Sequence, residues 1–390
     1  MLKWAGRAAQ AAIMILGLNL MAAAPARAAD PDSTNGWNYG YDSLLRDLGE
    51  WRKSPHVRID SVGATVKGRA LWMVSITAVG DSVGRSGDLT PRKHRVFMHA
   101  RTHPAEVQAQ RVANEAIRFL LADNPQAEAL RRDFIFNIIP MYNPDGVELG
   151  KPRQNAHDSD LERNWNYATM EPEPIALKKT FQSFMAGPIP IEVALNLHSD
   201  QFNCTRFFVF HFPAGTSQAY SDLEKSFIAG VQARFPGGIK DYTFNQTWPV
   251  QPGLQYPEGF WWSNYHENVM ALTYEDTNCP NAGRFDSTAT ALVLGSVDYI
   301  KARMTAPVLA RAKTETRVLL VPEGVRIAGG PEGGRWELVD SRGRRMAEGA
   351  TGAQGALLAW NGLPNAPMRI LSVAWPGGVR SRVVLPASAR

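Results

Sequence analysis

Residues 96–106 constrain this chain more than any other stretch, because an apolar run stops there and a histidine and a glutamate follow it. Residues 96–98 read as a buried strand, and residues 107–121 have helical periodicity. The spacing of His103 and Glu106 at the start of a helix lets an imidazole and a carboxylate face one point. These are two of the three protein ligands that a catalytic zinc site needs. Taken alone, the pair also fits a partly exposed histidine and a surface glutamate.

Strand-like and helix-like segments alternate over most of the chain. Apolar strands are predicted at 57–59, 71–76, 95–100, 133–140, 192–197 and 269–274, and amphipathic helices at 38–51, 107–121, 175–185, 219–235 and 287–304. The alternation predicts an α/β fold, with a mixed, mainly parallel sheet and helices on both faces. The first two strands are expected to form a hairpin or meander, and residues 147–167 and 237–260 are expected to be long loops.

Polar residues follow several of these strands directly. His198 ends the strand at 192–197, and Glu275 ends the strand at 269–274. Since the carboxyl ends of parallel strands share one edge of a sheet, these residues are expected to meet His103 and Glu106 there, near an N-P-D-G turn at 143–146. His198 would complete a zinc set with an open fourth position, and Glu275 would take the proton of the activated water. A hydrogen-bonded structural histidine and a carboxylate paired to an arginine are the alternatives.

Two arginines lie in the predicted loop between these anchors. Arg153 and Arg163 each carry a planar, permanently charged fork that suits carboxylates and oxyanions. Together with zinc and a general base, they would suit hydrolysis of an amide beside a carboxylate. The alternative is that both are solvated surface residues.

The N-terminus, residues 1–28, reads as a cleaved export signal. Lys3 and Arg7 precede an apolar stretch, and an A-R-A cleavage pattern ends at residue 28. A retained anchor is the alternative. We therefore expect an exported, periplasmic or secreted protein whose mature chain has no transmembrane segment.

The chain has two cysteines, Cys204 and Cys279. An oxidising compartment favours a disulfide between them, and each lies a few residues past a predicted strand end at the same edge. The bridge is expected to clamp the rim of the site. Two separate buried thiols are the alternative.

After residue 305 the pattern changes to short strands separated by glycine, proline and asparagine, without helical stretches. This predicts a small, sandwich-like all-β domain over residues 306–390. The expected organisation is thus a signal at 1–28, a catalytic domain at 29–305 and this β domain.

Several motifs together resemble the zinc carboxypeptidase family, most closely its cytosolic-carboxypeptidase-like branch. They are G-R-A-L-W at 68–72, H-P-A-E at 103–106, P-M-Y-N-P-D-G-V at 140–147, E-R-N-W-N at 162–166, L-N-L-H-S at 195–199 and L-T-Y-E at 272–275. The resemblance covers roughly residues 38–300. It implies one zinc ion on His103, Glu106 and His198, with Glu275 as general base. It also implies that Arg153 polarises the scissile carbonyl and that Arg163 binds the terminal carboxylate.

Three positions depart from the family pattern or fit it loosely. Glu162 stands where the family usually has asparagine, so it either receives an ammonium group of the substrate or pairs with an arginine and points away. The position of the family's mobile tyrosine falls near Gly253, with Tyr256 close by. Phe260 lies about where the residue for side-chain specificity is expected, which suggests an apolar or mixed pocket.

The sequence therefore predicts an exported zinc metallocarboxypeptidase that hydrolyses a C-terminal peptide bond by a zinc-activated water. One alternative is a peptidoglycan stem-peptide carboxypeptidase or amidase, for which the ammonium of a diamino acid would suit Glu162. Another is a zinc-binding protein whose catalysis has lapsed. The expected partner is a peptide or a peptidoglycan fragment, and no nucleic acid.

Overall fold

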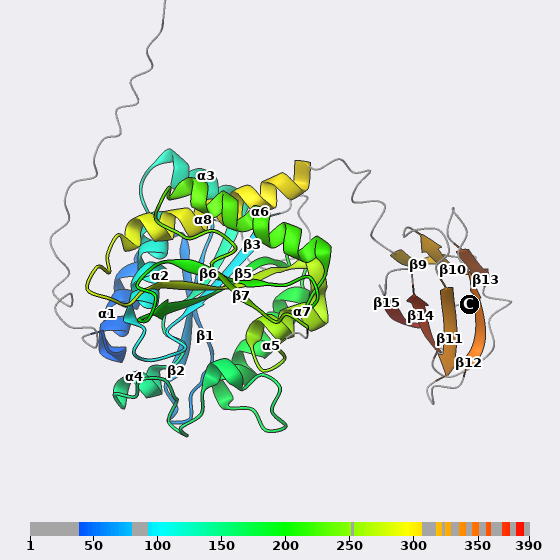
Figure 1. The fold of residues 1–390 in the computed structure, drawn as a ribbon, viewed down its shortest axis with the longest axis horizontal. Coiled ribbons are helices and arrows are strands. Elements are labelled where there is room, and N and C mark those ends of the chain that lie inside the picture. Colours follow the sequence, from blue (N-terminus) through cyan, green and yellow to red (C-terminus); the bar gives the residue numbers. More distant parts are fainter. Residues whose placement is uncertain are drawn as a thin grey trace, which may run out of the picture.

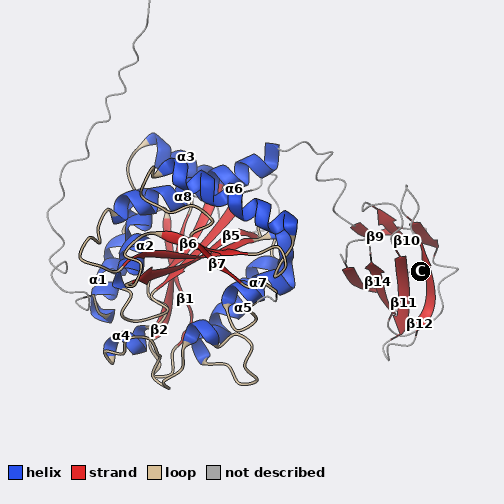
Figure 2. Ribbon diagram, in the orientation of Figure 1, coloured by secondary structure: helices blue, strands red, loops and turns tan. Residues whose placement is uncertain are grey.

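The structure of the 390-residue chain, a computed structural model, describes residues 39–79, 93–250 and 253–305, and seven strands between residues 317 and 385. The predicted export signal lies outside the described residues. The described residues between 39 and 305 form an eight-stranded sheet with helices on both faces (Figures 1 and 2). The strand order is β1-β2-β4-β3-β5-β8-β6-β7.

The elements of this part follow one another as α1 (Tyr41–Trp51), β1 (Val57–Ala64), β2 (Ala70–Ile76), β3 (His94–Ala100), α2 (Val107–Leu120), α3 (Pro125–Asp133), β4 (Phe134–Ile139), α4 (Pro144–Glu148), η1 (Leu161–Arg163), α5 (Pro172–Ala186), β5 (Ile191–Asp200), β6 (Phe207–His211), α6 (Gln218–Arg234), β7 (Asn245–Thr247), α7 (Pro257–Tyr265), η2 (His266–Asn268), β8 (Met270–Thr277) and α8 (Phe285–Thr305).

The four central strands β4, β3, β5 and β8 run parallel, so their carboxyl ends meet at one edge. β1 and β2 form the expected antiparallel hairpin, and β2 pairs antiparallel with β4. β6 pairs antiparallel with β8 on the other side of the centre. The prediction of a mixed, mainly parallel sheet with helices on both faces is confirmed.

The period-2 alternation of the strands divides the core into two layers. On β3, Val96 and Met98 pack into one hydrophobic cluster with the apolar faces of α1, α2, α6 and α8. Phe97 points the other way, into a cluster built mainly with α5 and α7. The same alternation on β5 and β8 sends every second side chain toward the α5 and α7 face, and this decides which polar residues can share a site.

Some elements were not expected from the sequence. α3 buries little more than Ala127 and Leu130 of its apolar residues, so its periodicity is weak; the side chain of Asn124 caps it. β6 is a run of four apolar residues that ends in His211, without a clear alternation. Parts of the two predicted loops are short elements, namely α4, η1, β7 and the start of α7.

The C-terminal strands form two antiparallel sheets. One has the order β13-β10-β9 and the other β12-β11-β14-β15. Their bounds are β9 (Arg317–Val321), β10 (Gly324–Ala328), β11 (Arg335–Asp340), β12 (Arg345–Ala350), β13 (Ala356–Ala359), β14 (Arg369–Ala374) and β15 (Arg380–Leu385). Across the parts of the chain that the structure describes, no helix is both long and apolar enough to cross a membrane.

Candidate active site

His103, Glu106 and His198 converge at the carboxyl edge of the sheet. Nδ1 of His103 lies 2.6 Å from Oε1 of Glu106, and Nδ1 of His198 lies 2.8 Å from Oε2 of the same carboxylate. The two Nδ1 atoms are 3.1 Å apart. Ligand atoms of the three residues all lie within 4.8 Å of one another, and both imidazoles are buried.

A sharp corner after β3 presents His103. Arg101 takes a left-handed φ of 63° and is fully buried. Its Nε donates to the carbonyl of Pro104 at 2.6 Å, and its guanidinium also donates to the side chain of Gln110 on α2. Glu106 then occupies the N-cap position of α2. The first ligand pair is thus held between the end of a strand and the start of a helix.

The protonation pattern of the two histidines fits a shared zinc ion. Nε2 of His103 lies 3.2 Å from Asp160, and Nε2 of His198 lies 3.1 Å from Glu162. Because Asp160 and Glu162 accept hydrogen bonds, we expect each imidazole to carry its proton on Nε2. The two Nδ1 lone pairs and the Glu106 carboxylate then face one point. A cation satisfies all three at once, and two histidines with one glutamate are a catalytic zinc set.

Asp160, which sequence reasoning missed, organises one wall of the site. It faces His103, accepts a hydrogen bond from Nε of Arg153 at 2.8 Å, and accepts another from Arg163 at 3.0 Å. Against the opposing effect of burial, the contacts with His103 and Arg153 hold the pKa of Asp160 below its usual range. The carboxylate therefore positions a metal ligand and both predicted arginines together.

Glu162 does not pair with an arginine among the described residues. It is buried, and its carboxylate contacts Nε2 of His198 and accepts from Nδ2 of Asn196 at 3.0 and 3.1 Å. These partners, and no arginine, take its hydrogen bonds within the described chain. The acid still lines the cavity of the site.

Glu275 on β8 stands opposite His198 on β5 in the register of the sheet. Burial, followed by the negative charges of Glu106, Asp200 and Glu162, raises the pKa of Glu275, while His198 opposes the shift. A carboxylate with a raised pKa beside a metal site is a stronger proton acceptor than a free carboxylate, which suits the role of general base.

The second arginine and the predicted tyrosine contact each other. Nε of Arg163 donates to the hydroxyl of Tyr256 at 3.3 Å, and the Arg163 side chain is 51% exposed. Arg163 thus has room to receive a substrate group, with Tyr256 beside it.

A cavity of about 740 Å³ lies in front of these residues. It is lined by His103, Glu106, Arg153, Glu162, Arg163, His198, Tyr256 and Glu275, together with residues not foreseen, such as His211, Glu258 and Thr273. Phe260 differs from the prediction: it packs against Trp165, Phe181 and Trp261 in the core under α7, and the cavity wall is formed by Glu258 of the same helix. Phe260 itself therefore lies outside the cavity lining, and the wall near it is mixed, with Glu258 and Thr273 beside Trp248 and Tyr256.

The missed residues had a weak signal in the sequence. Asn196 and Thr273 precede His198 and Glu275 by two positions, which is the spacing of one sheet face. His211 ends β6, a strand that was not predicted, and Glu258 lies in a segment read as a loop.

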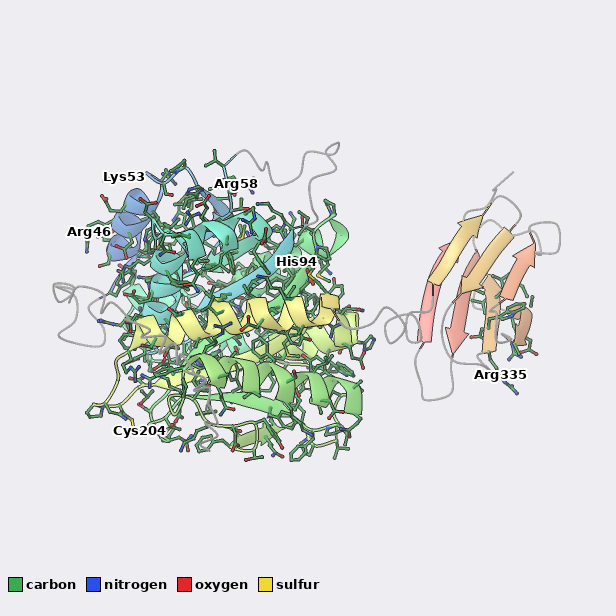
Figure 3. The ribbon with its side chains drawn as sticks, turned by 90° about the horizontal axis from the view of Figure 1, so that it is seen from above. Arg46, Lys53, Arg58, His94, Cys204 and Arg335 are labelled. Carbon is green, nitrogen blue, oxygen red and sulfur yellow. A yellow bond between two sulfur atoms is a disulfide. The ribbon has the colours of Figure 1, made fainter. Side chains whose placement is uncertain are left out.

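The expected disulfide between Cys204 and Cys279 is present, with a Cα separation of 5.4 Å. It joins the segment after β5 to the segment after β8, and Cys204 lies at the periphery of the ribbon (Figure 3). Gln201, Phe202 and Asn278, which line the cavity, belong to these two segments. The bridge therefore ties two parts of the rim.

Comparison with known sequences agrees with this site. A family model described as zinc carboxypeptidase matches residues 43–285. The chain is similar to cytosolic carboxypeptidase 6 of Caenorhabditis elegans, at 32% identity over 173 residues, and to cytosolic carboxypeptidase 4 of Homo sapiens, at 37% over 134 residues. The first alignment covers 43% of this chain and 36% of the relative, and the second 33% and 12%. The alignments therefore span well under two thirds of either relative.

Solved structures show the same fold. A metallo-carboxypeptidase from Burkholderia cenocepacia has a TM-score of 0.56 and 20% identity, covering 68% of this chain and 70% of its own. Carboxypeptidase A from Helicoverpa armigera has a TM-score of 0.50 and 17% identity, covering 68% and 72%. At these identities the likeness shows a shared fold alone.

Proposed function

The chain belongs to the zinc carboxypeptidase family. We propose that it is an exported enzyme that hydrolyses the C-terminal peptide bond of peptides. The observation that carries the proposal is the convergence of His103, Glu106 and His198 on one point, with Glu275 opposite His198 in the adjacent strand. A zinc set, a carboxylate base and two arginines around one cavity suit hydrolysis of an amide beside a carboxylate.

His103, Glu106 and His198 would hold one zinc ion, which as a Lewis acid supplies water activation and polarisation of the carbonyl. The Glu275 carboxylate accepts the proton of the attacking water and delivers it to the leaving amine. Its position on a buried strand keeps the carboxylate directed at the cavity.

The two arginines divide the charge of the substrate between them. Arg153, held by Asp160, stabilises the oxyanion that develops on the scissile carbonyl. Arg163, with the hydroxyl of Tyr256 beside it, binds the terminal carboxylate. Asp160 fixes the spacing of the two guanidinium groups, because both donate to its Oδ2.

Export is supported by two independent features. Residues 1–28 have the pattern of a cleaved signal, and the chain carries a disulfide, which persists in oxidising compartments. The curated relatives are named cytosolic carboxypeptidases, so on this proposal the chain uses a related catalytic domain in a different compartment.

The test uses the purified protein with one peptide in free and C-terminally amidated forms. The free peptide should lose its last residue, and the amidated peptide should not. Glu275→Gln should retain stoichiometric zinc and lose most of the turnover, on the order of 100-fold or more. Equal cleavage of both peptide forms would contradict the carboxypeptidase assignment, and full zinc occupancy in His198→Ala would contradict the ligand assignment.

A further inference from the structure

The loop before η1 carries two of the charged groups of the active site. Arg153 lines the cavity, and Asp160 contacts Nε2 of His103. Although Arg153 and Asp160 are seven positions apart, Nε of the arginine donates to Oδ2 of the acid at 2.8 Å. The segment between them therefore folds back on itself, and its shape sets where the Arg153 guanidinium lies relative to the zinc ligands.

Asn155 closes this segment into a turn of residues 155–159, called the Asn155 turn below. Asn155 is fully buried, and its Oδ1 accepts from the backbone N–H groups of His157 and Ser159 at 3.0 and 3.1 Å. The backbone N–H of Asn155 donates to the carbonyl of Ser159 at 2.9 Å, and Asp158 takes a left-handed φ of 59° between them. One amide oxygen with two lone pairs thus satisfies two backbone donors inside the turn.

Acids of α5 hold the Asn155 turn in place. Glu171, the N-cap residue of α5, accepts from Nδ2 of Asn155 at 3.0 Å and from Oγ of Ser159 at 3.1 Å. Its carboxylate also lies 2.8 Å from Nδ1 of His157, and Glu173 accepts from the same Nδ2 of Asn155 at 3.2 Å. Against the opposing effect of burial, these hydrogen bonds hold the pKa of Glu171 below its usual range. Glu171 is therefore ionised at neutral pH, and hydrogen bonds to a charged acceptor are stronger than those between neutral groups.

Glu171 also contacts the segment that carries the second arginine. Its backbone N–H donates to Oδ1 of Asn164 at 2.6 Å, and Asn164 is buried and directly follows Arg163. The Arg163 guanidinium in turn donates to Asp160 at 3.0 Å. Both arginines line the cavity, whereas Glu171 is not among its described lining residues. Glu171 thus contacts the segments of both arginines without lying in the cavity wall.

We propose that Glu171 is a positioning residue, which holds the Asn155 turn and through it sets the place of Arg153 and Asp160. The inference rests on the proposed function, in which Arg153 stabilises the oxyanion. The substitution Glu171→Gln leaves one acceptor oxygen in place of two, so at least one donor of the turn loses its partner. The Arg153–Asp160 pair then shifts relative to the zinc ligands, which are held where β3 and β5 end and α2 begins.

The test is a double-mutant cycle on kcat and KM, measured at saturating zinc with a peptide whose C-terminus is free. Glu171→Gln should lower kcat by about 10–100-fold with a smaller effect on KM, because the oxyanion forms only in the transition state. In the Arg153→Ala background the same substitution should change kcat by less than about twofold, since the group that Glu171 positions is gone. An equal loss in both backgrounds, which a general structural role would give, overturns the proposal.

A matched control and a milder variant accompany the cycle. Glu192→Gln removes another carboxylate that lies against a histidine, 2.6 Å from Nδ1 of His94, where β5 and β3 begin, and it should leave kcat unchanged. Ser159→Ala removes one of the donors to Glu171 and should lower kcat in the same way but less. The same cycle with Ser159→Ala decides the question if Glu171→Gln does not fold, and an unchanged kcat in the variant that folds overturns the proposal.

Hydrogen exchange tests the Asn155 turn without turnover. The backbone N–H groups of His157 and Ser159 are bonded to Asn155, and they should exchange at least about tenfold faster in Glu171→Gln than in the wild type or in Glu192→Gln. Unchanged exchange overturns the proposal whatever the kinetics show. If the wild type releases no residue from any peptide, the proposed function fails, and exchange still decides whether Glu171 holds the turn.

Discussion

At the scale of single residues, Glu162 shows how a contact decides a role. Its place before Arg163 suggests a direct influence on the substrate, yet its carboxylate is committed to Nε2 of His198 and to Asn196. A carboxylate that accepts a hydrogen bond from Nε2 of a metal-binding histidine fixes the tautomer and orientation of the ring. It also makes Nδ1 of that ring a better metal ligand. We therefore expect Glu162 to act mainly through His198.

Glu162→Asn should lower zinc affinity by about 10–100-fold, because the outer partner of His198 is lost. The measurement is competition for zinc with a chelator of known affinity. Glu115→Gln on α2, which removes an acid paired with Arg118 at the surface, is the control and should leave zinc affinity unchanged. Unchanged affinity in Glu162→Asn, with an altered preference for the terminal residue, would return Glu162 to substrate recognition.

Glu258 predicts a pH dependence of specificity. Burial, followed by the negative charge of Glu162, raises its pKa to about 7, against an opposing effect of His211. The group is therefore largely neutral at pH 6 and largely ionised at pH 8, so attraction for an ammonium group increases as pH rises. The neighbouring Thr273 does not titrate.

The quantity to measure is kcat/KM for a peptide ending in lysine, divided by kcat/KM for the same peptide ending in norleucine. The ratio is used because ionisation of Glu275 affects both peptides equally. This ratio should rise between pH 6 and pH 8 in the wild type and change much less in Glu258→Gln. A ratio that falls as pH rises would show that the ionised Glu258 carboxylate does not attract the ammonium group of the substrate.

At the scale of elements, the short helix α4 supports the loop that carries His103. Asn143 caps α4 through Gly146 N–H and donates to the carbonyl of Thr102 at 3.1 Å. Asp145, fully buried, pairs with Arg69 at 2.7 Å and accepts from the backbone N–H of Lys67. The N-P-D-G motif therefore links the β1–β2 hairpin to the loop that carries His103.

The substitution Gly146→Ala tests whether this motif supports the His103 loop. A Cβ there would lie 2.4 Å from Cγ of Pro104 and 2.4 Å from the carbonyl oxygen of Gln154, which are distances that require the loop to shift. We expect a loss of about 1–3 kcal/mol of unfolding free energy, together with weaker zinc binding. Gly230→Ala in the middle of α6 meets nothing within 4 Å and should be neutral or up to ~1 kcal/mol stabilising. Denaturant titrations of the three proteins decide, and equal stability of all three would show that the loop adapts without cost.

At the scale of the whole molecule, sheet topology assembles the site from distant segments. β3, β5 and β8 are neighbours in the sheet, so His103, His198 and Glu275 meet although loops and helices separate them in the chain. The disulfide adds a covalent link between two of these segments at the rim, across 75 residues of sequence.

Replacing both Cys204 and Cys279 by serine should lower the unfolding free energy by ~4 kcal/mol or less, the chain-entropy value for a loop of this length. Zinc content should not change, because neither cysteine contacts a ligand. Denaturant unfolding and metal analysis of the variant measure the two quantities, with the wild type under reducing conditions as a second comparison. Loss of zinc in a folded variant would show that the bridge positions the metal site and not the rim alone.

The sequence by itself determined the elements whose signals are local: the long amphipathic helices and the buried strands β3, β5 and β8. It placed His198 and Glu275 just past their strands, whereas they lie within the last residues of β5 and β8. Because parallel strands share an edge, even the convergence of the metal ligands could be inferred. The tertiary structure alone decided the partners of these residues. Asp160 and Glu162 turn to the two histidines, Phe260 turns into the core, and Glu258 and His211 reach the cavity wall from an unforeseen helix start and strand. Periodicity specifies which face a side chain occupies, whereas its neighbours across that face depend on strand order and helix packing, which no local pattern encodes.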